Sequence, residues 1–573
     1  MYVLYNKFMN AQQDILFALS DTIAQLNEKI TVELDIPENY TNGDYSTSIA
    51  LKLSKKLGKS PREVAEDIKQ KIEERKISAL ERIEIAGPGF INFYLSKEYL
   101  VTNLNLIREQ KDRFGESDKL QKVKIMVEFT DPNPLKEFHI GHLYSNVVGE
   151  SISRLLESQG AVVMRACYQG DVGMHVAKAL FGIMSLGLQI DEMQGKSLLA
   201  RAKFLGEAYA LGAKKYEEND EIKDEIRELN KKIYSHDSEV YPLYEQVKEW
   251  SLLYFEKMYE RLGTKYEKYY FESKVGEEGI KIVKENLGRV FREDNGAIIF
   301  PKEKSGLHTR VFINSQGLPT YEAKELGLAP RKYEDFHYDQ SIIITGNEIN
   351  EYFKVLLKAL SLIRPDLAEK TIHISHGMVR LPSGKMSSRT GDVITCEWLL
   401  DETKQKLKDA HTEMSEDVSE KLTIGAVKYA LLKVGIGSDI TFSFEESINL
   451  HGNSGPYIQY VYARTQNVLD KFEKSEYEVT YPNALMIEEK EVLGKLIHFP
   501  EVVERAAASF SPSMLSTYLY DLSQLFNVFY EKYRIYQEED AAVQNFRRAL
   551  TEVTGYVLRN GLHLLGINAP SKI

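Results

Sequence analysis

The first part of the chain ends in an alternating pattern of apolar and polar positions. Residues 83–95 alternate around Gly87-Pro88-Gly89, and this spacing predicts two strands joined by a tight turn. The residues before them include stretches with helical spacing. We therefore expect a small α+β domain over residues 1–110.

A strand–helix–strand pattern comes next. Val123–Phe129 is an apolar strand, a loop interrupted by prolines follows it, and helical spacing begins near His142. Ala161–Tyr168 is a second apolar strand, and a unit of this kind builds a parallel sheet. Four shorter strands are expected to complete that sheet, namely Ala297–Phe300, Val311–Ile313, Ser341–Thr345 and Thr371–Ser375.

Two regions are predicted to be helical throughout. Residues from about 176 to 265 are rich in Lys and Glu, which is typical of a helical insertion within the sheet region of residues 111–440. Residues 441–573 have apolar positions at helical spacing and predict an all-α bundle. The helices expected in the bundle are Tyr457–Phe472, Lys490–Phe510, Ser513–Tyr533 and Ala541–Leu565.

Composition indicates a globular protein outside the membrane. The 573 residues, 43% hydrophobic and 28% charged, correspond to roughly three or four domains. No apolar run is long enough to span a bilayer, and the N-terminus lacks the pattern of a secretory signal, so we expect a cytoplasmic protein. Cys167 and Cys396 lie in unrelated contexts, which predicts buried or incidental thiols rather than a disulfide or a zinc site.

The net charge of −12 restricts the kind of nucleic acid partner. A protein that coats nucleic acid without selectivity neutralises many phosphates at once, which an acidic chain is poorly suited to do. A selective RNA reader depends more on shape, stacking and exposed bases, and charge leaves that class open.

The tetrad His139-Ile140-Gly141-His142 lies between the first strand and the helix that follows it. A helix N-terminus offers unpaired N–H groups and a positive dipole end, which suits ATP phosphates, and Gly141 lets a nucleotide approach the backbone. The two imidazoles can donate hydrogen bonds to phosphate oxygens as charge develops. The alternative is that both histidines only cap the helix, and the tetrad alone does not decide between the two.

A second polar loop lies far downstream, at residues 381–391. Its cations Lys385 and Arg389 are placed to hold a pyrophosphate leaving group, as mobile cationic loops do in phosphoryl chemistry. Taken alone, such a loop is more often a solvated turn.

Together the two motifs resemble the HIGH and KMSKS signatures of the class I aminoacyl-tRNA synthetases. The tetrad is identical to the consensus, whereas Ser388-Arg389 replace its Lys-Ser, which leaves open which residue supplies the second cation. The resemblance implies a Rossmann-type α/β catalytic domain that forms an aminoacyl-adenylate from ATP, accompanied by Mg²⁺, and then charges tRNA. It assigns catalysis to His139, Gly141, His142, Lys385 and Arg389, and ATP binding to the tetrad together with Lys385, Met386, Ser387 and Ser388.

Acidic residues near the tetrad suggest which amino acid is activated. A guanidinium carries a permanent charge and five N–H donors, so its pocket must supply carboxylates. Glu128, Asp131 and Glu325 are candidates, and Tyr321 lies four residues before Glu325, on the same face if the segment is helical. An ordinary surface carboxylate is the alternative for Glu325.

Two longer segments, residues 127–134 and 455–464, resemble those of arginyl-tRNA synthetases. That family implies contacts of Asn133 and His142 with the arginine backbone, in a turn lined by Asp131 and Pro132. The family's Tyr and Asp map onto Tyr321 and Glu325, where this chain has the longer acid, and its usual Arg before the acid is replaced by Lys324. A further polar family position falls near residues 347–350, where Ile349 stands by spacing, so its counterpart is not assigned.

The same resemblance covers nearly the whole chain and implies the partners L-arginine, ATP and tRNA(Arg), with a monomeric enzyme outside the membrane. The first domain is similar to an N-terminal extension that touches the tRNA elbow, and residues 441–573 are similar to an anticodon-binding domain. Core packing is the alternative for the aromatic candidates. The tRNA-binding candidates are Phe90 and Asn92, with Phe93 beside them, and Tyr460 and Arg464, with Gln459 beside them.

Two rival functions remain at this point. One is a related class I synthetase or nucleotidyltransferase, which would not need Glu128, Asp131 and Glu325 together. The other is a non-catalytic tRNA-binding protein, although both histidines, Gly141 and Lys385 are present. ATP–pyrophosphate exchange across amino acids, with and without tRNA, separates them, and the family implies that exchange requires tRNA.

Overall fold

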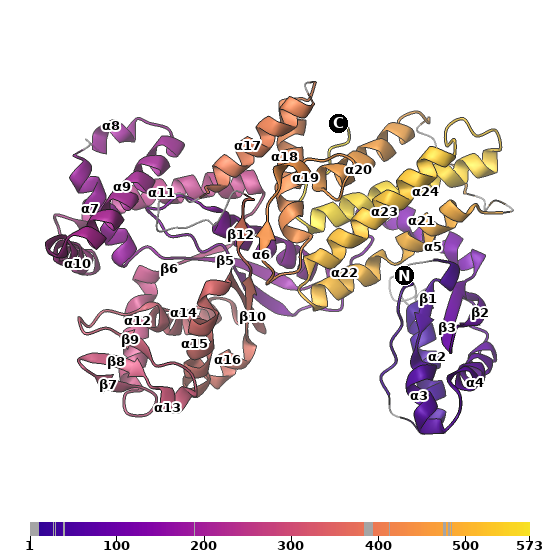
Figure 1. Ribbon diagram of the computed structural model, residues 1–573, viewed down its shortest axis with the longest axis horizontal. Coiled ribbons are helices and arrows are strands. Elements are labelled where there is room, and N and C mark those ends of the chain that lie inside the picture. The colour runs from indigo at the N-terminus through magenta and orange to yellow at the C-terminus, as the bar shows by residue number, and fades with distance from the viewer. Residues whose placement is uncertain are drawn as a thin grey trace.

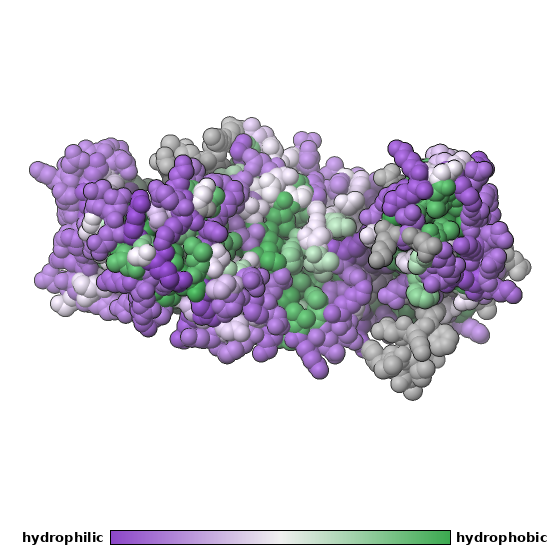
Figure 2. Space-filling model, turned by 90° about the horizontal axis from the view of Figure 1, so that it is seen from below, coloured by the Kyte–Doolittle hydropathy of each residue, from purple (hydrophilic) through white to green (hydrophobic). Residues whose placement is uncertain are grey.

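The computed structural model describes residues 11–26, 28, 30–37, 40–187, 190–382, 394–411, 413–473, 477–479, 482 and 484–573. The molecule is elongated, with the N-terminal unit at one end, the parallel sheet in the middle and a helical insertion at the other end (Figure 1). The face shown in Figure 2 is largely hydrophilic, with hydrophobic residues gathered near its middle. No described helix is long and apolar enough to cross a membrane.

The N-terminal unit has the predicted α+β character. Helices α2 (Ala11–Gln25), α3 (Ile49–Leu57) and α4 (Pro61–Glu73) pack on a sheet of order β1-β3-β2, formed by Tyr45–Thr47, Phe90–Leu95 and Leu80–Ala86. Strands β2 and β3 pair antiparallel around the Gly-Pro-Gly turn, which confirms the strand–turn–strand prediction. Gly89 has φ +143, and a Cβ there would lie 2.8 Å from the Pro61 carbonyl oxygen, so this turn needs a glycine.

The central sheet is parallel, with five strands in the order β11-β10-β4-β5-β6. Strand β4 (Lys124–Glu128) leads through α6 (Ile140–Ser158) to β5 (Val162–Gln169), as predicted. Because parallel strands end at the same edge, the sheet gathers the residues after β4, β5 and β10 in one place. The remaining strands are β6 (Lys268–Phe271), β10 (Gln340–Gly346) and β11 (Thr371–His376).

Two of the four shorter predicted strands do not join this sheet. Strand β8 (Ala297–Phe300) pairs antiparallel with β9 (Arg310–Ile313) on one side and with β7 (Arg292–Asp294) on the other, in a separate sheet. The sequence analysis also missed β6, the edge strand, whose Lys-Tyr-Tyr-Phe sequence lacks an aliphatic run. The composition of a four-residue segment can suggest that it is a strand. Which strand it pairs with is decided by tertiary contacts.

The predicted helical insertion is present as five helices that share a hydrophobic core of their own. Two further helices, α12 (Glu272–Glu285) and α14 (Tyr321–Phe336), flank the small sheet and cross each other closely. The insertion consists of α7 (Met174–Leu186), α8 (Ile190–Gln194), α9 (Leu198–Glu218), α10 (Asp220–Tyr234) and α11 (Tyr241–Leu262).

The C-terminal region is all-helical, as predicted, and shares one hydrophobic cluster with the central sheet and α6. The expected helix 490–510 is two helices that meet at His498, because Pro500 lacks an N–H and starts a new first turn. Both cysteines are free and buried, as expected. The helices are α18 (Glu416–Leu432), α20 (Gly455–Leu469), α21 (Ile487–Ile497), α22 (Phe499–Ala508), α23 (Pro512–Lys532) and α24 (Ala541–Leu564).

Candidate active site

A tight loop connects the end of β4 to the tetrad. Thr130 and Asp131 adopt left-handed backbone conformations, with φ of 79 and 43, so the chain turns sharply after the strand. The Thr130 backbone N–H donates to Ser145 Oγ at 2.8 Å, which attaches the loop to the first turns of α6. This turn places Asp131, Asn133 and the tetrad at the carboxyl edge of the sheet, where open α/β sheets bind their ligands.

The two tetrad histidines cap the helix that they begin. His139 Nδ1 accepts from the backbone N–H groups of Gly141 at 3.1 Å and His142 at 3.4 Å. His142 Nδ1 in turn accepts from the backbone N–H of His139 at 3.3 Å, and the two rings stack with centroids 3.6 Å apart. The capping interpretation is therefore correct as geometry. It is compatible with phosphate binding, because a neutral imidazole whose Nδ1 accepts carries its proton on Nε2 and can donate it.

Burial keeps both rings uncharged. Burial, with a smaller contribution from nearby Lys136, lowers the pKa of His139 to about 4. Burial and the neighbouring His139 hold the pKa of His142 well below its usual value. At neutral pH the tetrad therefore offers two neutral Nε2–H donors rather than two cations.

The downstream signature residues Lys385, Met386, Ser387, Ser388 and Arg389 lie outside the described residues. Both flanks of their loop are described. Before it, β12 (Val379–Arg380) pairs in parallel with β13 (Ile440–Thr441). After it, Ile394 O accepts from the backbone N–H of Ile140 at 3.0 Å, and the Cys396 N–H donates to Phe138 O at 2.8 Å. The end of the loop is thus hydrogen-bonded to the tetrad itself.

Carboxylates gather beside this edge, as the sequence suggested, but two of them already have a cation. Glu128 is buried with Lys332, whose Nζ lies 2.9 Å from Glu128 Oε2. Glu272, at the start of α12, is buried with Lys324 at 2.5 Å. Both pairs are internal to the protein, so Glu128 does not face the site as a free acceptor.

Asp131 and Glu325 differ from those two acids, because neither has an ion pair among the described residues. Asp131 Oδ1 accepts from the Tyr168 backbone N–H at 2.6 Å. Burial and then the charge of Glu128 raise the pKa of both carboxyls well above their ordinary values. Two half-buried acids that have no cationic partner among the described residues are what a bound guanidinium would complete.

Tyr321 and Glu325 share a face of α14, as predicted. Tyr321 is 53% exposed at the start of the helix, whereas Glu325 is half-buried one turn further in. Lys324 Nζ lies 5.1 Å from the centre of the Tyr321 ring, so the aromatic ring stands beside a cation that is already paired with Glu272.

Asn133 packs against the backbone after β5. A Cβ on Gly170 would lie 2.3 Å from Asn133 Oδ1 and 3.4 Å from Glu272 Oε1, so these groups surround one point. The Gly170 carbonyl is held by His175 Nε2 at 2.7 Å, and burial lowers the pKa of His175 to about 3. Pro132, before Asn133, is buried in the loop.

Several polar residues of this site were missed by the sequence analysis. Glu272 follows β6, which was not recognised as a strand, and Lys332 gave no signal apart from a helical position. Asp171 is fully buried and accepts from Ser273 through both its N–H at 2.9 Å and its Oγ at 2.7 Å. Its place two residues after a parallel strand was the available signal.

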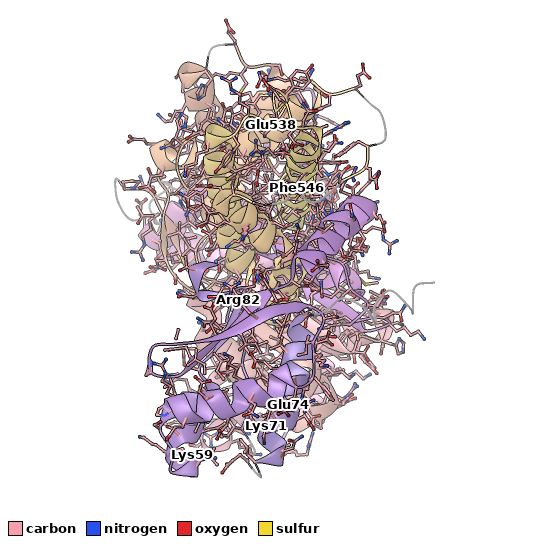
Figure 3. The ribbon with its side chains drawn as sticks, turned by 90° about the vertical axis from the view of Figure 1, so that its right-hand side faces the viewer. Lys59, Lys71, Glu74, Arg82, Glu538 and Phe546 are labelled. Atoms are coloured by element: carbon pink, nitrogen blue, oxygen red, sulfur yellow. The ribbon has the colours of Figure 1, made fainter. Side chains whose placement is uncertain are left out.

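One of the candidates on the N-terminal unit lies at the surface. Phe90 is 40% exposed, but Asn92 is 3% exposed and its Oδ1 accepts from Ser46 Oγ at 2.8 Å. Asn92 is therefore engaged inside the sheet, which corrects its selection as a base contact, and Phe93 is core. Figure 3 shows this unit beside the bundle that carries Glu538 and Phe546, with Lys59 and Lys71 toward its far end.

The tRNA-binding candidates of the C-terminal bundle also differ in their exposure. Arg464 donates to Asn527 Oδ1 at 2.5 Å and its guanidinium lies 5.0 Å from the Tyr460 ring centre. These two residues, with Lys471 and Tyr530, line a cavity of about 160 Å³. Gln459 is fully buried and donates to the carbonyls of Lys421 and Asn568, so its selection as an exposed residue was wrong.

Three family models match the chain in succession. The model described as tRNA synthetases class I (R), catalytic domain, matches residues 103–444, which is more than half of the chain. The arginyl tRNA synthetase N terminal domain matches residues 9–95, and the DALR anticodon binding domain matches residues 458–573.

Curated relatives and a solved structure agree with these models. The arginine–tRNA ligase of Clostridium acetobutylicum is 30% identical over 93% of this chain and 95% of its own, and that of Treponema denticola is 31% identical over 94% of each. The structure of Thermus thermophilus arginyl-tRNA synthetase, 22% identical, shares the fold with a TM-score of 0.81 and covers 98% of this chain and 100% of its own. The chain belongs to the class I arginyl-tRNA synthetases, the enzymes that activate arginine with ATP and charge tRNA(Arg) with it.

Proposed function

We propose that arginine is selected by Asp131 and Glu325, which receive the guanidinium at the carboxyl edge of the sheet. The observation that carries this proposal is the division of the acids into two kinds. Lys332 and Lys324 neutralise Glu128 and Glu272, while Asp131 and Glu325 keep raised pKa values because burial and Glu128 act on both. A guanidinium offers the planar, permanently charged donor set that two such acids require.

The other expected substrate contacts fit around this pair. Tyr321 forms the exposed wall, and Asn133 and His142 lie on the tetrad side, where the α-amino and carboxylate groups of arginine would face ATP. In this arrangement Glu128 acts through Lys332 rather than by touching the substrate. Because Lys332 pairs with Glu128, it does not serve as the ion-pair partner of Asp131 or Glu325.

The test is ATP–pyrophosphate exchange with Glu325→Gln. The amide keeps the size of the side chain and removes its charge, so KM for arginine should rise by about 100-fold or more while KM for ATP changes less than threefold. Glu334→Gln, the same change at an exposed position of α14, is the matched control. Equal losses for arginine and ATP would show that Glu325 does not read the guanidinium.

For the activation step, we propose that the Nε2–H groups of His139 and His142 donate to the phosphate oxygens of ATP. Lys385 and Arg389 would hold the pyrophosphate, with Met386, Ser387 and Ser388 completing the loop, and Gly141 would allow close approach of the nucleotide. Mg²⁺ keeps several waters and is bound chiefly through substrate phosphates, so we expect it to arrive with ATP and to neutralise phosphate charge.

For tRNA, we propose a division of the chain into residues 1–110, 111–440 and 441–573. The first part would touch the tRNA with Phe90, and the last would read the anticodon loop with Tyr460 and Arg464. Two neighbouring cavities support this, because both are lined by Val468, Lys471 and Tyr530 and together combine aromatic rings with cations. We further propose that the enzyme acts as a monomer in the cytoplasm.

A further inference from the structure

The last turn of the bundle is attached to the helix that carries the tetrad by a set of polar contacts that the reaction itself does not use. Ser151 Oγ donates to Leu564 O at 3.0 Å, and Arg154 Nη1 donates to His563 O at 3.0 Å. Both donors lie on α6, and both acceptors lie at the C-terminal end of α24. The last carbonyls of a helix lack intrahelical donors and carry the negative end of the dipole, so they suit cationic and hydroxyl donors.

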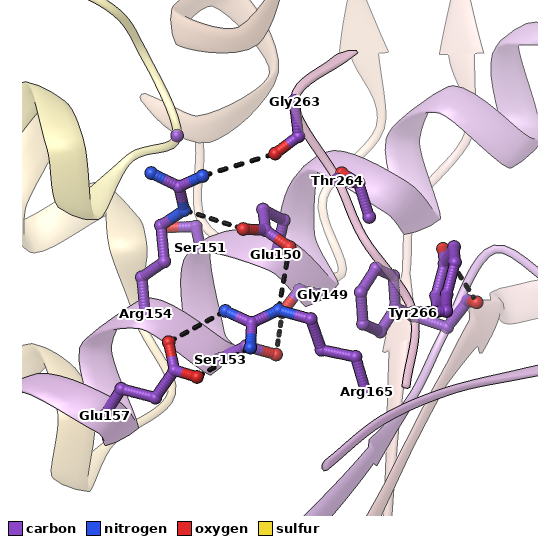
Figure 4. Close-up of polar contacts among 12 residues, drawn as sticks. Gly149, Glu150, Ser151, Ser153, Arg154, Glu157, Arg165, Gly263, Thr264 and Tyr266 are labelled. Carbon is purple, nitrogen blue, oxygen red and sulfur yellow. Dashed lines mark hydrogen bonds and ion pairs between the residues drawn. The ribbon is translucent and has the colours of Figure 1, made fainter. Parts of the chain in front are cut away.

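Arg154 does not move freely, because an ionic network fixes it to the sheet (Figure 4). Its Nε donates to Glu150 Oε1 at 2.7 Å, and the second oxygen of Glu150 accepts from Arg165 Nε at 3.0 Å. Arg165, on β5, also binds Glu157 through two parallel bonds of 2.6 and 2.8 Å. The contact to α24 is thus the outer end of a network that joins α6 to the central sheet.

Lys428, on α18, completes the attachment from the other side. Its Nζ donates to Leu262 O at 2.6 Å and Gly566 O at 2.7 Å, although the residue is only 1% exposed. Lys428 thereby connects α18 to the end of α11 and to the segment after α24. A Cβ on Gly566 would lie 3.0 Å from this Nζ, so the chain passes directly over the ammonium group.

Burying Lys428 opposes folding rather than favouring it. No carboxylate contacts its Nζ among the described residues, and burial, followed by the charge of Arg154, lowers its pKa to about 7. An ammonium group held only by carbonyls costs more than an apolar side chain of the same volume. Lys428 therefore contributes to the relative position of the bundle and the sheet rather than to stability. The hydrophobic core that they share keeps them together but does not fix a single relative position.

We propose that Arg154 and Lys428 are positioning residues that transmit the placement of the tRNA-reading bundle to the tetrad imidazoles through α6. This rests on the proposed role of the bundle in reading tRNA. Arg154 lies twelve residues after His142, which is about 18 Å along one continuous helix. Because α6 is rigid, its attachment to the bundle near one end determines the position of the imidazoles at the other end.

The experiment compares Lys428→Met with Lys421→Met in the full-length enzyme, using tRNA(Arg) charging. Lys421 is on the same helix and pairs with Asp417 at the surface, so it controls for the substitution itself. For Lys428→Met we expect kcat to fall about tenfold, KM for tRNA to change less than twofold, and the melting temperature to stay the same or rise. Arg154→Met should lower kcat in the same way, and the double variant should lose little more than the larger single loss.

Each other outcome overturns the proposal. An unchanged kcat in Lys428→Met would show that the attachment does not reach the active site. A fall in kcat that follows a lower melting temperature would show a structural role only, and a raised KM for tRNA with intact kcat would show a direct tRNA contact. Failure of the proposed reading role of the bundle is distinguishable, because Arg464→Ala would then leave KM for tRNA unchanged in the same charging assay.

Discussion

At the residue scale, the tetrad histidines cap the helix through Nδ1, which leaves Nε2 for the proposed contact with phosphate. Nδ1 of His139 caps α6, which satisfies backbone N–H groups that would otherwise lack partners. Nε2 is then left protonated and available to a phosphate. The observed cap and the proposed phosphate contact therefore use different nitrogens, so substitutions can remove them separately.

His139→Asn should keep the cap and lose the phosphate donor, because the asparagine Oδ1 occupies the place of Nδ1. We expect adenylate formation to fall by about 10²-fold with a nearly unchanged melting temperature. His139→Gln should do the reverse, costing about 1 kcal/mol of stability through the lost cap while retaining more activity. Single-turnover kinetics and thermal unfolding measure both variants, and parallel losses in the two variants would contradict this separation.

We expect arginine binding to depend on pH through Asp131 and Glu325, the proposed guanidinium acceptors, neither of which has an ion pair among the described residues. Burial and Glu128 raise the pKa of Asp131 and Glu325 in the free enzyme, and a bound guanidinium would favour their ionised forms. Binding should therefore release protons, and arginine affinity should rise with pH until the pH exceeds the raised pKa values of the two carboxyls. Calorimetry in two buffers of different ionisation enthalpy measures the released protons, and Glu325→Gln should reduce their number.

At the scale of elements, the proposed arginine site lies beside the place where α12 and α14 cross closely. A Cβ on Gly279 of α12 would lie 1.9 Å from Ala323 O, and a Cβ on Gly327 of α14 would lie 2.3 Å from Val275 O. The two backbones thus touch where they cross, next to Tyr321 and Glu325. Glycine is required here by contact between helices rather than by backbone conformation.

Gly279→Ala should push α14 outward and so displace the acid that it carries. We expect a loss of about 1–3 kcal/mol in unfolding free energy, together with a raised KM for arginine. Gly276→Ala, on the same helix, would place its Cβ 3.3 Å from Pro319 Cγ and 4.0 Å from Lys324 Cγ, with no backbone atom that close, and should be milder in both respects. Denaturant unfolding and exchange kinetics provide the two measurements.

At the scale of the whole molecule, the N-terminal unit has a hydrophobic core separate from that of the rest. Among the described residues of the bundle, only Ile497 belongs to its cluster of buried residues, and polar contacts such as Tyr45 OH to Glu501 at 2.5 Å add to the junction. Such a unit can be removed with limited damage to its neighbour.

An enzyme that lacks residues 1–96 should therefore fold and retain arginine activation at saturating tRNA. Its KM for tRNA should rise about tenfold or more, because one stacked aromatic contributes about 1–3 kcal/mol. Phe90→Ala in the full chain should reproduce part of this rise. Charging kinetics over a range of tRNA concentrations check both, and an unchanged KM in the truncated enzyme would remove the N-terminal unit from tRNA binding.

The sequence by itself determined the features that depend on neighbours along the chain. Hydrophobic spacing identified the β4–α6–β5 unit, the helical insertion and the bundle, and the Gly-Pro-Gly turn predicted the β2–β3 hairpin. The tetrad's place at a helix start was also readable, since helix caps are formed by residues a few positions apart. The resemblance to the family rested on the same local motifs.

Only the tertiary structure decided which distant residues meet. Strand β6 joins the parallel sheet, whereas β8 and β9 belong to another sheet. Lys332 pairs with Glu128, and Lys324 pairs with Glu272. Asn92 and Gln459 are buried rather than on the surface. The physical reason is that pairing and burial depend on contacts between segments far apart in sequence, which local spacing does not record. The proposal that Asp131 and Glu325 receive the guanidinium rests on those contacts.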